Sequence, residues 1–103
     1  MTFSANSLER LELLQQHRRE NNQFWADERL ERETLTHQQR QEVHQLPKIE
    51  LDFMAKATLM RRHISQDTEF RGLSNERQRD LRDRHKQELL DLTERQSKDE
   101  TTA

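Results

Sequence analysis

Histidine is the residue type in this chain that first suggests chemistry, because the sequence contains five histidines and no cysteine. His37 and His44 are seven residues apart, which places both on one face of a helix, and His63 follows later in the chain. Helical zinc sites more often use histidines four residues apart with a third ligand, and the sequence has no HExxH motif. We therefore expect polar helix-face histidines, no metal site and no cofactor.

The acidic residues do not indicate a catalytic site. The single glycine provides almost no material for glycine-rich turns or nucleophile elbows. Several acids precede an arginine by four residues, as in Glu28–Arg32, Asp80–Arg84 and Asp91–Arg95, which is the spacing of ion pairs on a helix surface. Exposed carboxylates of this kind are not tuned for acid–base catalysis near neutral pH. We expect no catalytic residues and no enzymatic activity.

Arginine is the abundant cation, with 14 arginines and 4 lysines, and a guanidinium group binds phosphate well. Two basic clusters are candidate nucleic-acid contacts: Arg61, Arg62, Arg77, Arg79, Arg82, Arg84 and Lys86. Glu76, Asp80 and Asp83 interrupt the second cluster, whereas a phosphate-binding track tends to exclude acids. The net charge of −2 gives no global attraction to nucleic acid or to an anionic membrane. Nucleic-acid binding is therefore the alternative hypothesis.

Pairs of adjacent apolar residues favour protein binding. Neighbouring residues on a helix point about 100° apart, so a seam between two helices buries one member of a pair and leaves the other near its edge. Three such pairs, Leu13-Leu14, Phe24-Trp25 and Leu89-Leu90, exceed what a two-stranded seam needs. The expected partner-binding residues are Leu14, Phe24, Trp25, Leu89 and Leu90. The simplest partner is a second copy of the chain, as a homodimer.

The composition predicts one all-helical domain over residues 1–103. Charged residues make up 37% of the chain and hydrophobic residues 29%, with one glycine and one proline. Strong helix formers dominate, which is typical of coiled coils. Because the core is thin, we expect self-association or a partner protein to stabilise it. The sequence shows no signal peptide and no apolar stretch long enough to span a membrane, so we expect a cytoplasmic protein without membrane contact.

Three helices are expected, at 5–45, 48–71 and 75–98, followed by a loose tail at 99–103. Ser4 or Ser7 is placed to cap the first helix. Leu46-Pro47 marks a tight turn, and Gly72 marks a second break or a kink. The lengths match a long antiparallel helical hairpin, similar to a coiled coil, whose second arm is kinked or broken near Gly72.

Two apolar patterns are expected to hold the hairpin together. The first is a stripe of Ile49, Phe53, Ala57, Met60 and Ile64, with steps of three and four residues. The second is an eleven-residue spacing that occurs twice and predicts a nearly straight contact. Its members are Leu13, Phe24, Leu35 and Leu46, then Leu59, Phe70, Leu81 and Leu92. A tight turn at Leu46-Pro47 places Phe24 near residues 70–72 and Leu13 near residues 81–85.

These features favour a non-enzymatic helical module for protein–protein interaction, acting as an adaptor, a chaperone-like protein or an assembly factor and associating with itself. The alternative is a helical protein that binds nucleic acid through its arginine clusters. No motif in the sequence identifies a family.

Overall fold

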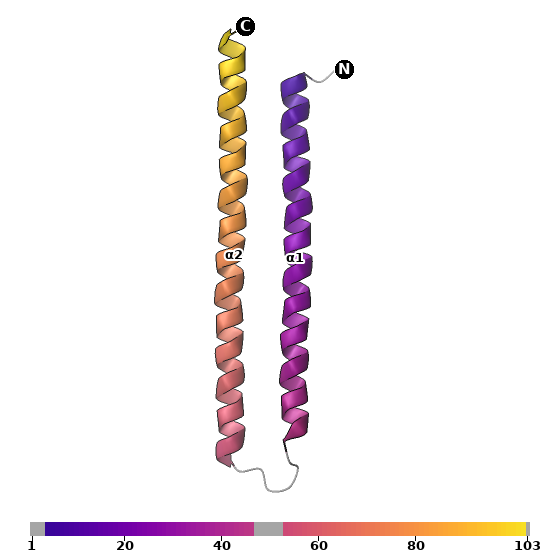
Figure 1. Cartoon of the computed structure of the whole chain (residues 1–103), viewed down its shortest axis with the longest axis vertical. Helices are drawn as coiled ribbons and strands as arrows, with labels where there is room; N and C mark the ends of the chain where they lie inside the picture. The colour runs from indigo at the N-terminus through magenta and orange to yellow at the C-terminus, as the bar shows by residue number, and fades with distance from the viewer. Residues whose placement is uncertain (1–3, 47–52, 103) are drawn as a thin grey trace. The chain divides into compact units, whose positions relative to one another are not determined.

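The computed structural model describes residues 4–46 and 53–102, and these residues form two long α-helices (Figure 1). Helix α1 spans Ala5–Gln45 and helix α2 spans Phe53–Thr102. The expected all-α fold, an antiparallel helical hairpin, is confirmed. Pro47 and the expected tight turn there lie outside the described residues.

Helix α1 begins with a side-chain cap, and it covers the same residues as the first expected helix. The Ser4 hydroxyl accepts a hydrogen bond from the Ser7 backbone N–H at 3.1 Å, and the Ser4 carbonyl accepts one from Leu8 N–H at 3.0 Å. The hydroxyl satisfies a backbone donor of the first turn that has no partner within the helix. Ser4, rather than Ser7, is therefore the N-cap.

Helix α2 corrects the expected organisation of the second arm. One helix, Phe53–Thr102, stands in place of the expected helices 48–71 and 75–98, and it continues through Thr102 where a loose tail was expected from residue 99. Residues 48–52 lie outside the described part of the chain. Gly72 is exposed inside the helix, and the expected kink is not confirmed. An isolated glycine is tolerated because strong helix formers on both sides outweigh its unfavourable propensity of about 1 kcal/mol.

The chain divides into two compact units. Unit 1 consists of Met1–Trp25 and Arg77–Ala103, and unit 2 consists of Ala26–Glu76. In unit 1, the contacts Asn6–Gln96 and Glu20–Arg84 show that α1 and α2 run antiparallel. In unit 2, Gln39 contacts His63, Gln66 and Asp67 of the opposite helix. The expectation of a single domain stays a prediction.

The eleven-residue spacing forms the seam, which is the line of contact between the two helices within each unit. All eight residues of the two expected series are buried or half-buried. Leu92, with 7% of its surface exposed, is the only buried apolar side chain in the described residues. The other seam positions are largely polar, and they include His17, Gln39, His63 and His85. The spacing is confirmed, and the core that it builds is thin.

The first expected stripe is wrong as a core element. Phe53 is 80% exposed, and Met60 and Ile64 are also exposed, whereas Ala57 is half-buried. Ile49 lies outside the described residues. The seam of unit 2 instead uses Leu59, His63, Gln66 and Phe70 of α2. Regular helical spacing of apolar residues thus identified a face of α2, but a different face packs against α1.

The expected pairing register is also wrong. Phe24 lies beside Gln78, Leu81 and Arg82, and Leu13 lies beside Leu92. A tight turn at residues 46–47 would pair each residue of α1 with an earlier residue of α2. Because α1 ends at Gln45 and α2 begins only at Phe53, the midpoint of the pairing falls later in the chain.

We expect Gly72→Ala to stabilise the protein by about 0.5–1 kcal/mol, because alanine loses less backbone entropy in a helix. An added Cβ at this position meets nothing within 4 Å. Thermal unfolding followed by circular dichroism should show a melting temperature raised by roughly 2–8 °C. A lower melting temperature would instead indicate that Gly72 supplies a bend that alanine resists.

We expect Leu92→Ala to destabilise the protein by about 2 kcal/mol, because it removes most of a buried side chain from a thin seam. Leu90→Ala is the matched control, since Leu90 is 54% exposed on the same helix. Its effect should stay within about 0.5 kcal/mol. Urea unfolding of both variants checks this difference, and equal effects would contradict the assignment of Leu92 to the seam.

Candidate interaction surface

The geometry of an antiparallel helix pair sorts the residues that flank the seam onto two sides. A residue that directly follows a seam position points to one side of the pair, whichever helix carries it, and a residue that directly precedes one points to the other side. In unit 1, the seam positions of α1 are Glu9, Leu13, His17, Glu20 and Phe24. Those of α2 are Leu81, His85, Glu88 and Leu92. These positions repeat with steps of three and four residues.

The side formed by the residues that follow these positions is called the Trp25 side. Helix α1 contributes Arg10, Leu14, Arg18, Asn21 and Trp25, and helix α2 contributes Arg82, Lys86, Leu89 and Thr93. Half-buried Gln78 of α2 also belongs to this side, because it lines a depression with Trp25. Contacts across the pair support this assignment. Arg10 donates a hydrogen bond to the Thr93 hydroxyl at 3.2 Å, and Trp25 and Arg82 line one depression from the two helices. The Trp25 side carries apolar, polar and cationic residues and no acid.

Trp25 is the largest apolar side chain on this side, and 49% of its surface is exposed. Its ring meets the half-buried ring of Phe24 edge-on, with centroids 5.2 Å apart at 83°. This arrangement is favourable for aromatic rings and holds Trp25 over the seam. Phe24, Trp25, Leu81 and Arg82 line a shallow depression of about 220 Å³. An exposed aromatic ring beside such a depression is a typical anchor for a protein partner.

The opposite side of unit 1 is built from ion pairs. Arg84 pairs with Glu20, and Arg95 pairs with Glu9, so both arginines cross the seam to α1. Arg84 also lies 3.5 Å from Glu88 on its own helix. A larger hollow of about 680 Å³ lies on this side, with a lining dominated by charged and amide side chains. Four carboxylates and two guanidinium groups line this hollow, so acids are in excess there.

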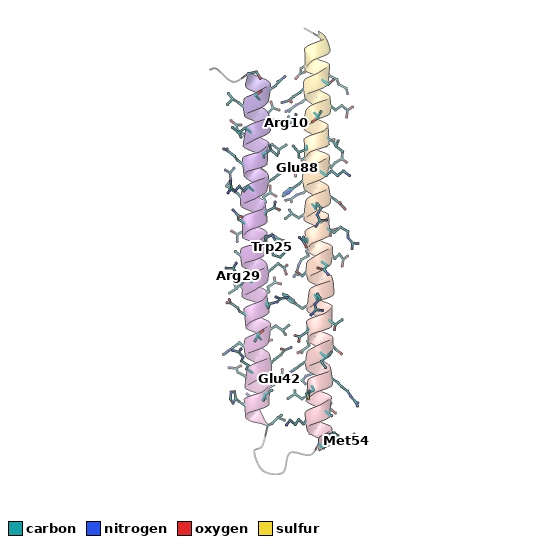
Figure 2. All side chains as sticks on the ribbon, turned by 180° about the vertical axis from the view of Figure 1, so that it is seen from behind. Arg10, Trp25, Arg29, Glu42, Met54 and Glu88 are labelled. Carbon is teal, nitrogen blue, oxygen red and sulfur yellow. The ribbon has the colours of Figure 1, made fainter. Side chains whose placement is uncertain are left out.

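Two buried histidines stack in the seam of unit 1. The rings of His17 and His85 are 3.9 Å apart between centroids and tilted by only 14°. His85 Nε2 lies 3.5 Å from Glu20, and His17 Nε2 lies 3.6 Å from Glu88, which is too long for a hydrogen bond. Figure 2 shows Glu88 on α2. The four side chains fill a position of the seam that would otherwise need apolar residues.

Burial lowers the pKa of His85 below its ordinary value of 6.5, because desolvation disfavours the charged imidazolium. Repulsion by His17 and then by Arg84 lowers the pKa further, and Glu88 opposes the shift. At neutral pH the His85 ring is therefore uncharged. An uncharged ring stacks on His17 without the repulsion of two imidazolium ions.

Unit 2 also has an acid that pairs with an arginine and a histidine across the seam. Glu42 binds both Arg62 and His63 across the seam, with His63 Nε2 at 3.1 Å. Arg32 lies over the ring of Phe70, 6.0 Å from its centroid, which is a cation–π contact. Arg40 and Val43 line a groove with His63. The arginines of unit 2 thus also divide between pairing with acids and lining the seam.

The structure brings together four of the five expected partner-binding residues. Leu14, Trp25 and Leu89 lie on the Trp25 side, and Phe24 lies beneath Trp25. Leu90 lies elsewhere, because it is two residues past the seam position Glu88 and turns away from α1. Leu14, Trp25 and Leu90 are exposed, and Leu89 is half-buried.

The expected nucleic-acid residues are dispersed around α2. Arg82 and Lys86 lie on the Trp25 side, whereas Arg62 and Arg84 pair with acids on the opposite sides of their units. Arg77 is exposed and occupies no seam position. Arg61 and Arg79 are also exposed, and each lies two residues from a seam leucine, so they point away from α1. Only two members of the expected clusters therefore share a side that lacks acids.

The interhelical pairs were not anticipated from the sequence, although their signal is present there. Arg84 and Arg95 were expected to pair along the helix with Asp80 and Asp91, but they pair with Glu20 and Glu9 of α1 instead. Glutamate recurs every eleven residues on α1, and His17 and His85 each follow a leucine of the seam by four. The glutamates are Glu9, Glu20, Glu31 and Glu42. The same spacing that identified the apolar seam residues thus also identifies their polar neighbours.

His37 and His44 are exposed, as expected for polar helix-face histidines. Among residues 4–46 and 53–102, no group of three His, Cys, Asp or Glu side chains is placed to hold a metal ion. In the same residues, neither helix has an apolar stretch long enough to cross a membrane.

Comparison with known proteins finds no matching family model, no matching curated protein and no matching solved structure. The function is therefore inferred from the side chains of this chain alone.

We expect stability to fall as the pH is lowered from 7.5 to 5.5. The pKa of His85 is lower in the folded state than in the unfolded chain, so the unfolded chain binds the proton more readily. The stabilising contribution is present above about pH 6.5 and is lost as the pH falls toward the folded-state pKa. Thermal unfolding across this range measures the loss.

His85→Gln should flatten the pH dependence, because the variant lacks the titrating ring. His37→Gln is the matched control, since His37 is exposed on α1, and it should retain the slope of the unmodified protein. An unchanged slope in His85→Gln would show that another group is responsible.

Proposed function

We propose that this chain is a non-enzymatic helical module that binds another protein through the Trp25 side of unit 1. It would act as an adaptor, a chaperone-like protein or an assembly factor. The observation that supports the proposal is that exposed Leu14 and Trp25 share one side of unit 1 with half-buried Leu89, and that Trp25 lines a depression there with residues of both helices. Tryptophan and arginine are the residues most enriched among interface anchors.

The thin seam also supports a protein partner. Leu92 alone is buried among the apolar residues that the structure describes, so the chain gains little from its own core. A partner that covers Trp25 and Leu14 buries apolar surface, which is favourable by about 25 cal/mol per Å². Because such a partner binds only the folded chain, it also stabilises the fold by mass action.

Nucleic-acid binding is the second candidate, because Arg82 and Lys86 share the Trp25 side and no acid lies between them there. Arginine, lysine and an exposed aromatic ring are the groups that bind a single-stranded nucleic acid. This candidate predicts binding that weakens steeply with added salt. Contact through apolar side chains depends much less on salt.

Site-specific photocrosslinking tests the leading proposal. A photoreactive phenylalanine derivative replaces Leu14 in one sample and Leu8 in another, in the cells that produce the protein. The two positions are matched, because both are exposed leucines of α1, at 45% and 44%. Leu8 precedes the seam position Glu9 and points to the opposite side.

We expect an adduct of one defined protein mass from position 14, none from position 8, and loss of the adduct when Trp25→Ala is added. Circular dichroism of Trp25→Ala should show unchanged helicity, since the ring is half exposed. No adduct, or equal adducts from both positions, would contradict the proposal. An adduct that nuclease removes would support the second candidate instead.

A further inference from the structure

We infer that the partner segment bound by the Trp25 side is an acidic amphipathic helix of another protein. This inference rests on the proposed function and adds the chemistry of the partner. It follows from the charges, the apolar residues and the depression on this side of unit 1.

The charges on the Trp25 side all have one sign. Arg10, Arg18, Arg82 and Lys86 are exposed, and the remaining positions of this side are neutral. The whole chain nevertheless has a net charge of −2. The fold therefore separates charges that are mixed in the sequence and creates a cationic side on an acidic chain. A partner with complementary charge is acidic.

The apolar residues on this side are spaced as the contacts of a bound helix would be. Leu14 and Trp25 are eleven residues apart, which is three turns or about 16 Å along α1. Leu89 supplies an apolar side chain from α2, and the depression that Trp25 lines lies between the helices. An amphipathic helix binds an apolar surface through residues spaced three or four apart. Glutamates flanking that stripe would meet Arg18 and Arg82.

A second copy of the chain fits this side less well. Pairing of two Trp25 sides would place the four cations of one copy against those of the other, which is unfavourable. Pairing of the Trp25 side with the opposite side of a second copy is a heterologous contact. Such contacts form a ring if the rotation between copies closes, and otherwise an open filament. That opposite side also mixes acids with Arg84 and Arg95.

Nucleic acid satisfies the cations but not the apolar residues. Phosphate groups would bind Arg18, Arg82 and Lys86, and a base would stack on Trp25. Leu14 and Leu89 would then have no apolar partner. An acidic amphipathic helix satisfies both sets of residues.

Trp25 provides the measurement, because it is the only tryptophan of the chain. The probe is a synthetic helical peptide of roughly five turns, about 18 residues, with a leucine stripe, flanking glutamates and no aromatic residue. Its control has the same leucine stripe with lysine in place of every glutamate. We expect the glutamate peptide to shift the Trp25 emission to shorter wavelength and to bind at least tenfold more tightly than the lysine peptide.

Neighbouring arginines give matched variants. Arg18→Glu alters the Trp25 side, and Arg19→Glu makes the same change on the opposite side of α1. We expect Arg18→Glu to weaken binding of the glutamate peptide at least threefold and Arg19→Glu to leave the affinity within a factor of 1.5, roughly 0.2 kcal/mol. Circular dichroism should show equal helicity for both variants.

Equal binding of the two peptides, or tighter binding of the lysine peptide, would overturn the inference. It would also be overturned by a single-stranded oligonucleotide that binds more tightly than the glutamate peptide. The inference would also be overturned if light scattering showed that the protein alone doubles its mass and the Trp25 emission shifts at the same time, because the Trp25 side would then bind a second copy. If the two peptides bind equally but position 14 still gives a protein adduct, the inference fails and the proposed function stands, because crosslinking does not depend on the charge of the partner.

Discussion

The structure depends on polar side chains finding partners across the seam, because apolar side chains alone are too few to hold α1 against α2. In unit 1, His17 and His85 stack on each other in the seam, and the Nε2 atom of each ring lies near a glutamate of the other helix. Gln39 and Glu42 have the same role in unit 2. Buried polar groups that lack partners destabilise a fold, so this seam strongly favours one pairing register.

The eleven-residue spacing explains how one chain carries two sides of different chemistry. Each helix position returns to the same orientation after three turns. Glutamates therefore collect along one edge of the α1 seam, whereas the residues after the seam positions are arginine, leucine, asparagine and tryptophan. Asp83 separates Arg82 from Lys86 in the sequence but does not lie on the Trp25 side with them.

Residue spacing predicted much of the fold and part of the candidate site. Leu13 and Leu92 were found because seam positions recur regularly, and Trp25 was found because two adjacent apolar residues cannot both enter a two-helix seam. Gly72 was misjudged because local propensity does not reveal how strongly the flanking helix resists a break. The face with Met60 and Ile64 was misjudged because helical periodicity identifies an apolar face without showing which face meets α1.

The repeat in the seam has a consequence for how such a chain can change in length. Eleven residues inserted into α1, with eleven more at the matching place in α2, would return every following residue to its former orientation. Leucine, histidine and glutamate of the seam would meet the same types of neighbour, and the cationic side would grow by one more segment. An insertion that is not a whole number of turns would rotate one helix and separate Glu20 from Arg84. Paired insertions of three turns are therefore the changes in length that preserve the contacts between the two helices.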